Sequence, residues 1–206
     1  MDYSVFLRPF LISDTETINQ WRNNEAIQQW TAGRFRKVSI EIERNWVQSK
    51  MTNNEKEEYF AICLNDSSKE MIGYFSIREI DIYNRKCFFG GIVIDPEYQE
   101  GVYMIDTHLI AFDYAFIHLG MNRIAGTCLE EHPVSRIMME MLGFKLEGIE
   151  QNSVYKNHKY HNLCNYALLY EDYKHYMKDN YYSKKNILKR LMQLKKVYKT
   201  LSTISK

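Results

Sequence analysis

The sequence predicts a single α/β domain built on a mixed sheet of about seven strands. The chain has 206 residues, of which 45% are hydrophobic and 14% aromatic, which is enough for one substantial core. Apolar residues alternate with a period of two in several short runs and recur with a period near 3.6 in others. The runs follow one another in the order β-α-α-β-β-β-α-β-α-β-β.

The first strand leads directly into a helix. Residues 5–12 alternate between apolar and polar side chains and stop at Ser13-Asp14, which is typical of a helix start. A helix is therefore expected to follow, and a second one over residues 39–51.

Three strands are expected next, over residues 58–64, 71–77 and 87–94. The first two are separated by Asn65-Asp66-Ser67-Ser68, which is typical of a hairpin turn, and the third ends at Asp95-Pro96. This succession predicts an antiparallel meander.

The apolar period then changes from two to 3.6. From about Met104 apolar residues recur at helical spacing until Gly120, a favoured residue at helix C-termini. A strand is expected over residues 123–129. Pro133 suits the first position of a short helix, which Gly143 ends.

The last two expected strands, 144–155 and 164–170, flank a polar turn at residues 156–159. Farther on, apolar side chains share one face of a lysine-rich helix. We therefore predict two parts: an α/β domain over residues 1–172, and a basic amphipathic helical extension over residues 173–206.

The charge is divided unequally along the chain. The net charge is +1, but residues 1–170 carry 17 Lys and Arg against 23 Asp and Glu, whereas residues 171–206 carry 10 against 3. An acidic body argues against nucleic-acid binding, because neutralising phosphates requires clustered Lys and Arg. The basic helix could dock on the body, pair with a second copy in a homodimer, or rest on an anionic membrane surface. Docking or dimerisation is the preferred interpretation.

The four cysteines lie far apart and form no Cys-x-x-Cys pair, which indicates buried free thiols in a reducing compartment. The first residues lack the pattern of a leader peptide, and no apolar stretch approaches the roughly 18 residues that span a bilayer. His158 and His161 have no carboxylate or thiol at ligand spacing. We expect a cytoplasmic protein with no bound metal.

Several motifs, in this order, resemble the GNAT acetyltransferases over residues 5 to about 172. They are Ile94-Asp-Pro-Glu-Tyr98 before one helix and Ser135-x-x-x-x-Glu140-x-x-Gly143-Phe144 in the next. Leu7-Arg8-Pro9, Trp21-Arg22-Asn23 and Phe144-x-x-Glu147-Gly148 look most similar to the branch of ribosomal-protein N-terminal and nucleotide-amino-sugar acetyltransferases. The resemblance implies the GNAT (acyl-CoA N-acyltransferase) fold, a mixed and mostly antiparallel seven-stranded sheet flanked by helices. It also implies acetyl-CoA as co-substrate.

The resemblance places the loop that binds the CoA pyrophosphate at Gln99-Glu100-Gly101-Val102-Tyr103-Met104. A helix start suits this anion because its free N–H groups and positive dipole end face the phosphates. Gln99 matches the family pattern, but its two small positions fall on Val102 and Met104. Three interpretations stay open: the loop shifts and uses Gly101, it binds CoA weakly, or it no longer binds CoA.

In the family a neutral amine attacks the thioester directly. This requires removal of an ammonium proton, stabilisation of an oxyanion and protonation of the leaving thiolate. The resemblance assigns the oxyanion to backbone amides at Ile92, Val93 and Ile94. The Tyr that many relatives use as acid is replaced by Met139, so Ser135, placed as in one branch, is the expected donor to the thiolate. The alternative is that Ser135 only satisfies the helix start.

Other polar residues are weaker candidates. His132 stands where relatives have an Asn that binds the pantetheine arm, so it could contact the cofactor, act as a general base, or simply be a polar residue at a helix start. Glu130, Glu131 and Glu79 lie at expected strand ends. Each could deprotonate the amine through water or be a surface carboxylate.

The segments Trp21-Arg22-Asn23 and Arg34-x-Arg36-Lys37 lie where relatives build the acceptor site. The three cations of the second segment suit an anionic acceptor such as a nucleotide diphosphate, although a solvated charged face is the alternative. We expect an N-acetyltransferase acting on a small amine, with a nucleotide-linked amino sugar ranked ahead of a protein N-terminus. A catalytically silent GNAT-fold binding module and a longer acyl donor remain alternatives, because the pyrophosphate loop is irregular.

Overall fold

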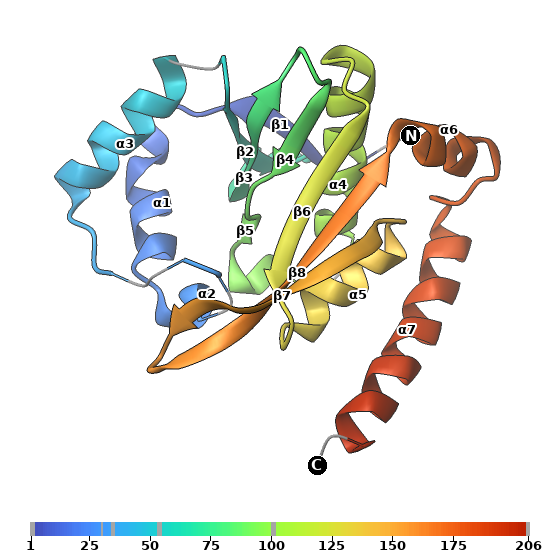
Figure 1. Cartoon of the computed structure of the whole chain (residues 1–206). Helices are drawn as coiled ribbons and strands as arrows, with labels where there is room; N and C mark the ends of the chain where they lie inside the picture. Colours follow the sequence, from blue (N-terminus) through green and yellow to red (C-terminus); the bar gives the residue numbers. More distant parts are fainter. Residues whose placement is uncertain (1–2, 30, 34–35, 53–54, 100–101, 205–206) are drawn as a thin grey trace. The chain divides into compact units, whose positions relative to one another are not determined.

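The structure is a computed structural model that describes residues 3–29, 31–33, 36–52, 55–99 and 102–204, with side chains described as far as residue 198. The chain forms two compact units, residues 1–124 and residues 125–206, and each is described by itself (Figure 1). Helices accompany mostly antiparallel strands, so the predicted α/β fold is confirmed.

The first unit contains a meander of antiparallel strands. Its strands are β1 (Val5–Pro9), β2 (Glu58–Leu64), β3 (Met71–Asp81), β4 (Lys86–Phe89) and β5 (Val93–Ile94). Their order is β1-β2-β3-β4, and β5 also pairs with β3. The single strand predicted over 87–94 is therefore two short strands, which makes eight strands in the described part of the chain instead of seven.

The helices of the first unit are α1 (Thr15–Arg22), α2 (Glu25–Gln28), α3 (Ile40–Thr52) and α4 (Tyr103–Asp113), and α4 continues into a π-helical turn, Tyr114–His118. Short 3-10 turns precede α1 (Ile12–Asp14) and follow β5 (Pro96–Tyr98). The four-residue α2 was not predicted. Helices α1 and α3 lie side by side (Figure 1). The core of this unit includes Phe10, Trp21 and Tyr74, and the partly buried Trp46 and Tyr59 pack against it.

One expected helix cap has a different role. Asp14 makes no side-chain cap on α1. Its carboxylate instead accepts two hydrogen bonds of 2.8 Å from the Arg8 guanidinium and one of 2.8 Å from the Leu11 N–H. Asp14 thus ties the end of β1 to the turn that follows it.

The second unit begins within β6 (Arg123–Leu129), which was predicted to the residue. It continues through α5 (Pro133–Met141), β7 (Lys145–Lys156), β8 (Lys159–Leu169), α6 (Tyr170–Lys178) and α7 (Lys184–Ile204). The strand order is β6-β8-β7. Asn157 and His158 form the two-residue turn between β7 and β8, both with positive φ angles as a tight hairpin turn requires.

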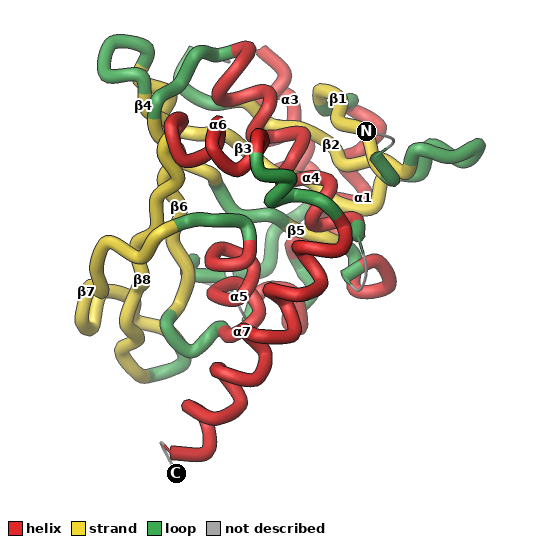
Figure 2. The backbone as a smooth tube through the Cα atoms, turned by 90° about the vertical axis from the view of Figure 1, so that its right-hand side faces the viewer, coloured by secondary structure: helices red, strands yellow, loops and turns green. Residues whose placement is uncertain are grey.

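The tail of the second unit is mainly helical. Figure 2 shows α7 running alongside α5, and the two helices are in contact. All four cysteines are buried and free, as predicted. No helix in the described part of the chain is both long and apolar enough to cross a bilayer. The division at residue 172 stays a prediction.

Candidate active site

The strand that should bind the thioester is bulged. Between the pairs Ile77–Phe89 and Tyr74–Val93, β3 contributes two residues, whereas the opposite segment contributes three, residues 90–92. Such an extra residue kinks a strand and leaves part of the ladder unpaired. Among the described residues, the amides of Gly91 and Ile92 form no hydrogen bond with another backbone group.

Two glycines make the bulge sterically feasible. A Cβ atom on Gly73 would lie 2.4 Å from the Val93 carbonyl oxygen, and one on Gly90 would lie 2.0 Å from the Ser76 hydroxyl oxygen. At Gly73 the backbones of β3 and β5 are therefore so close that no side chain would fit between them. The Gly90-Gly91 pair in the sequence was the signal for this kink.

The backbone direction in β5 determines which amides are available to a ligand. The Asp95 N–H donates to the Ile72 carbonyl over 2.8 Å. Because amides alternate in direction along an antiparallel strand, the Val93 amide also faces β3, whereas the Ile94 amide points away from it. Of the three predicted oxyanion donors, the Ile94 amide points away from β3 and the Ile92 amide has no backbone partner among the described residues, whereas the Val93 amide faces β3.

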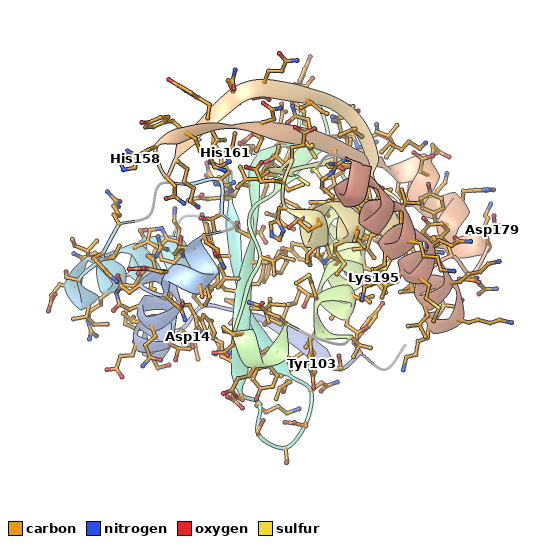
Figure 3. All side chains as sticks on the ribbon, turned by 90° about the horizontal axis from the view of Figure 1, so that it is seen from below. Asp14, Tyr103, His158, His161, Asp179 and Lys195 are labelled. Atoms are coloured by element: carbon orange, nitrogen blue, oxygen red, sulfur yellow. The ribbon has the colours of Figure 1, made fainter. Side chains whose placement is uncertain are left out.

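The start of α4 is the predicted pyrophosphate site. Val102 occupies the N-cap position, is 41% exposed, and makes no side-chain cap. The first N–H groups of an α-helix have no partner within the helix, so this start keeps donors for an anion. Figure 3 shows Tyr103 at this helix start. Glu100 and Gly101 lie outside the described residues.

The segment leading to α4 is held by side chains of the same unit. Asp95 accepts hydrogen bonds from the Glu97 N–H over 3.0 Å and from Trp21 Nε1 over 2.8 Å. Gln99 donates to the Ile94 carbonyl over 3.0 Å. The sequence placed Asp95 at the end of a strand and in the Ile94–Tyr98 motif, but it could not show the hydrogen bond to Trp21, because Trp21 lies 74 residues away.

A buried histidine supports the first turn of α4. His108 is 5% exposed, and its Nδ1 lies 2.7 Å from the Met104 carbonyl oxygen, so Nδ1 carries the hydrogen and donates it. Burial lowers the pKa of His108 to about 4, although the hydrogen bond to Met104 acts in the opposite direction. His108 is therefore neutral at pH 7.

Helix α5 in the second unit, unlike α4, begins with a side-chain cap. His132 is its N-cap residue, and His132 Nδ1 accepts the Ser135 N–H over a long 3.5 Å. Burial lowers the pKa of His132, so its imidazole is neutral at pH 7 with the hydrogen on Nε2. Within the described residues the Ser135 hydroxyl forms no hydrogen bond, so the capping is done by His132.

Glu130 lies just beyond β6 and is engaged with the neighbouring strand. Its carboxylate accepts a hydrogen bond of 2.8 Å from the Asn162 side chain. The Glu130 carbonyl accepts a hydrogen bond of 3.3 Å from Arg136, the residue that follows Ser135 on α5. The turn between β6 and α5 is thus fixed from both sides.

The Glu131 carboxylate and His161 Nδ1 are in contact next to this turn. His161 is 8% exposed and its two ring nitrogens face two oxygen acceptors, the Glu131 carboxylate and, at 3.1 Å, the Lys156 carbonyl. Burial is the largest influence on the pKa of Glu131 and raises it, but the hydrogen bond with His161, a backbone hydrogen bond and the nearby Lys159 together lower it overall. Figure 3 shows His158 and His161 at the same end of the hairpin.

The residues predicted to bind the acceptor are largely occupied within the first unit. Arg22 Nε lies 2.9 Å from the carboxylate of Glu43, which is fully buried, and the Arg22 guanidinium lies 4.2 Å from the centre of the Trp46 ring. Asn23 exchanges two hydrogen bonds of 2.9 Å with the backbone of Val38. These side chains organise the segment between α1 and α3.

The remaining predicted acceptor residues are Arg34, Arg36 and Glu79. Arg36 is exposed, and Arg34 lies outside the described residues. Glu79 is exposed and lies within β3, beside a second irregularity, with a positive φ of 52°. Among the described residues, no group of three or more His, Cys, Asp and Glu side chains could hold a metal ion.

Comparison with known proteins identifies the chemistry. An acetyltransferase (GNAT) domain family matches residues 4–145. The spermidine N(1)-acetyltransferase of Escherichia coli (strain K12) is 23% identical over 171 residues, which cover 83% of this chain and 89% of the relative.

Solved structures have the same fold. A spermidine N-acetyltransferase from Vibrio cholerae, in complex with CoA and spermine, superposes with a TM-score of 0.75 at 24% identity, covering 83% of this chain and 98% of that chain. A GNAT-family acetyltransferase from Bacillus anthracis gives 0.71 at 20% identity over 83% of this chain and 98% of its own.

A bulged strand with unpaired amides and an uncapped helix start suit an acyl-CoA-dependent transferase, which must bind an oxyanion and a pyrophosphate. The chain belongs to the GNAT acetyltransferase family and is an N-acetyltransferase that uses acetyl-CoA as co-substrate.

Proposed function

We propose that the protein acetylates a primary amine of a small polycation such as spermidine. The observation that supports this proposal is the ion pair between Arg22 and the buried Glu43. An anionic acceptor would need a free cation as its partner, but Glu43 already neutralises the Arg22 guanidinium. Lys37 is also engaged, with Glu25 at 3.5 Å and the Asn23 carbonyl at 3.3 Å. The similarity to spermidine acetyltransferases over four fifths of the chain supports the same substrate class.

The proposed reaction is a direct transfer. The lone pair of the neutral amine forms a bond to the acetyl carbonyl carbon, the charge on the carbonyl oxygen is stabilised by the amides of Ile92 and Ile94, and the carbon–sulfur bond then breaks. Ser135 donates a proton to the CoA thiolate, and its oxygen regains one from the nitrogen, which loses its second proton as the amide forms. Its hydroxyl suits this role because His132 already caps the helix.

The proton released by the ammonium goes to Glu130 through water. His132 is less suited to accept it, because its only basic nitrogen, Nδ1, already accepts the Ser135 N–H. We place the reaction in the cytoplasm, since four buried free thiols suit a reducing compartment.

A competition among acceptors tests the proposal. The protein is incubated with acetyl-CoA and one of three acceptor classes: spermidine and spermine, amino-sugar nucleotides, or short peptides with free N-termini. Free thiol release is measured, with Ser135→Ala as the control for contaminating activity. We expect kcat/KM for spermidine to be at least about tenfold higher than for the other classes, because ground-state charge complementarity differs between them.

Two other results identify the alternatives predicted from the sequence. A higher kcat/KM with an amino-sugar nucleotide would show that the preferred acceptor is anionic, in spite of the Arg22–Glu43 pair. A higher value with a peptide would indicate a protein N-terminal acetyltransferase. Propionyl-CoA and longer acyl-CoA donors, added in the same assay, test whether Val102 and Met104 select another acyl chain.

A further inference from the structure

One face of α7 is already occupied within the second unit. Ile187 is 4% exposed, Arg190 donates to the Met141 carbonyl over 3.0 Å and to the Tyr181 carbonyl over 2.8 Å, and the Tyr198 hydroxyl donates to Glu140 over 2.5 Å. Helix α5 therefore covers the apolar side of α7, as the two neighbouring ribbons show (Figure 2). The docking envisaged from the sequence accounts for this side of the helix and leaves the other side unexplained.

The opposite face of α7 is basic and exposed. At about 100° per residue, one arc of roughly 140° contains four exposed lysines and two exposed apolar residues, together with the helix positions of Lys196 and Lys199. The four lysines and two apolar residues are Lys184, Lys185, Lys189, Lys195, Leu188 and Met192. Leu188 is 52% exposed and Met192 63% exposed.

No negative charge accompanies these lysines. Residues 184–204 contain no Asp or Glu. Within the described part of the chain, none of the four lysines forms an ion pair with another residue. The only arginine of the helix, Arg190, is turned toward the ring of Tyr181, with its guanidinium 3.3 Å from the ring centre. The outward face thus combines uncompensated positive charge with two apolar side chains.

We propose that this face of α7 binds an anionic lipid surface. Lysine ammonium groups pair with acidic headgroups, while their methylene stems and the side chains of Leu188 and Met192 enter the interface between headgroups and acyl chains. A nucleic acid would use the lysines but would offer nothing to Leu188 and Met192, and this face carries no aromatic ring for stacking on bases. Because α7 keeps its docked side on α5, it lies on the surface without crossing the bilayer.

Vesicle sedimentation with the full-length protein tests the proposal. Vesicles of phosphatidylcholine alone are compared with vesicles containing 30% phosphatidylglycerol. We expect binding to the anionic vesicles only, and its loss at 0.5 M salt, where the Debye length falls to a few ångströms, about 4 Å. The triple variant Lys185→Glu/Lys189→Glu/Lys195→Glu should lower the apparent affinity by at least about 100-fold, since each lysine near such a surface contributes several-fold.

Matched controls separate this face from net charge. Lys56→Glu/Lys86→Glu/Lys159→Glu changes the charge by the same amount at exposed lysines outside α7 and should bind vesicles with less than about a threefold loss. The variant Leu188→Ser/Met192→Ser should lower the affinity severalfold without changing the number of charges. Circular dichroism and thiol release should be unchanged in every variant, which confirms that α7 remains folded.

Several results would overturn the proposal. They are equal binding to neutral vesicles, no binding to either kind, or equal losses in the α7 triple variant and its control. Insensitivity to Leu188→Ser/Met192→Ser, combined with retention of RNA on a filter, would assign the face to nucleic acid. Self-association in sedimentation velocity that the α7 triple variant abolishes would assign it to a second copy of the chain.

Discussion

The two helix starts that carry the candidate chemistry are built in opposite ways. Helix α4 begins at Val102 without a side-chain cap, whereas α5 begins at His132, whose ring accepts the Ser135 N–H, followed by Pro133. A capped start has used its donors for the stability of the helix. An uncapped start keeps them for a ligand.

The histidines next to the two starts differ in the same sense. His108 lies inside α4 and donates to a carbonyl of the first turn, whereas His132 accepts from an amide at the start of α5. Both are neutral, because burial lowers the pKa of each. The start of α4 can therefore offer its backbone N–H groups to a ligand, whereas the start of α5 offers a side chain, that of Ser135.

The largest expected effect concerns β5 and β6, the strands that precede the two helix starts. Gly73 lies in β3, where it pairs with β5. Gly73→Ala would place a Cβ 2.4 Å from the Val93 carbonyl oxygen, and a backbone atom cannot yield. In the matched variant Gly126→Ala, the Cβ would meet only the flexible end of Met139, at 2.9 Å. We expect losses in the free energy of unfolding of about 3 kcal/mol for Gly73→Ala and under about 1 kcal/mol for Gly126→Ala, measured by urea denaturation. Equal losses would show that β5 is no more constrained than β6.

The next effect tests the side chain that α5 presents. Ser135→Ala should lower kcat roughly 100-fold, the usual contribution of a general acid, with little change in the dissociation constant of acetyl-CoA. Thiol release gives kcat, and calorimetric titration gives the affinity. An unchanged kcat would reject Ser135 as the acid, and a large loss of affinity with normal kcat would make it a cofactor-binding residue.

A pH-dependent loss of stability should come from His108 at the other helix. The pKa of His108 is about 4 in the folded protein and near 6.5 in the unfolded chain, so between these values only the unfolded chain takes up the proton. Stability is therefore fully present above pH 6.5 and is lost as the pH falls toward 4. We expect His108 to account for about 2 kcal/mol of the loss between pH 7 and pH 5. Urea denaturation at both pH values checks this, and His108→Gln should reduce the difference by that amount.

Much of the fold was predictable because periodicity records which side chains are buried. The strand over residues 123–129 was predicted to the residue, and the start of α4 to within one residue. The break between β4 and β5 was missed although the Gly90-Gly91 pair marks it, because the kink depends on the close approach of Gly90 to Ser76, fourteen residues earlier. The two-residue turn at Asn157–His158 lies inside the polar segment predicted for it.

The site was less predictable, because its polar side chains form hydrogen bonds with residues that are distant in the sequence. Trp21 and Asn23 were assigned to the acceptor by resemblance, yet Trp21 bonds to Asp95 and Asn23 to Val38. Pro133 and His132 gave a correct helix start, but spacing alone could not decide whether His132 or Ser135 caps it. The catalytic and binding roles of these residues stay predictions until kinetics test them.

A smaller effect should follow from adding a charge to the uncapped start. Val102→Asp places a carboxylate among the free amides of α4, where it competes with the CoA pyrophosphate. We expect about a tenfold weaker affinity for acetyl-CoA, together with a gain of about 0.5 kcal/mol in the stability of the ligand-free protein, since an anion at a helix N-terminus is favourable. Val102→Asn has the same shape without the charge and should weaken binding less. Equal affinities for the wild type and Val102→Asp would mean that the pyrophosphate binds elsewhere.

The smallest effect should come from removing the cap that α5 already has. His132→Ala leaves the Ser135 N–H without its acceptor, and because that bond is long, 3.5 Å, the expected loss of stability is only about 0.5 kcal/mol. His132→Asn, which places a stronger capping residue there, should restore or exceed the wild-type melting temperature. If His132 acts only as a cap, kcat should follow stability and return with Asn. A kcat that stays low in His132→Asn, while the melting temperature recovers, would instead show that the imidazole takes part in the reaction, and would give α5 two functional side chains instead of one.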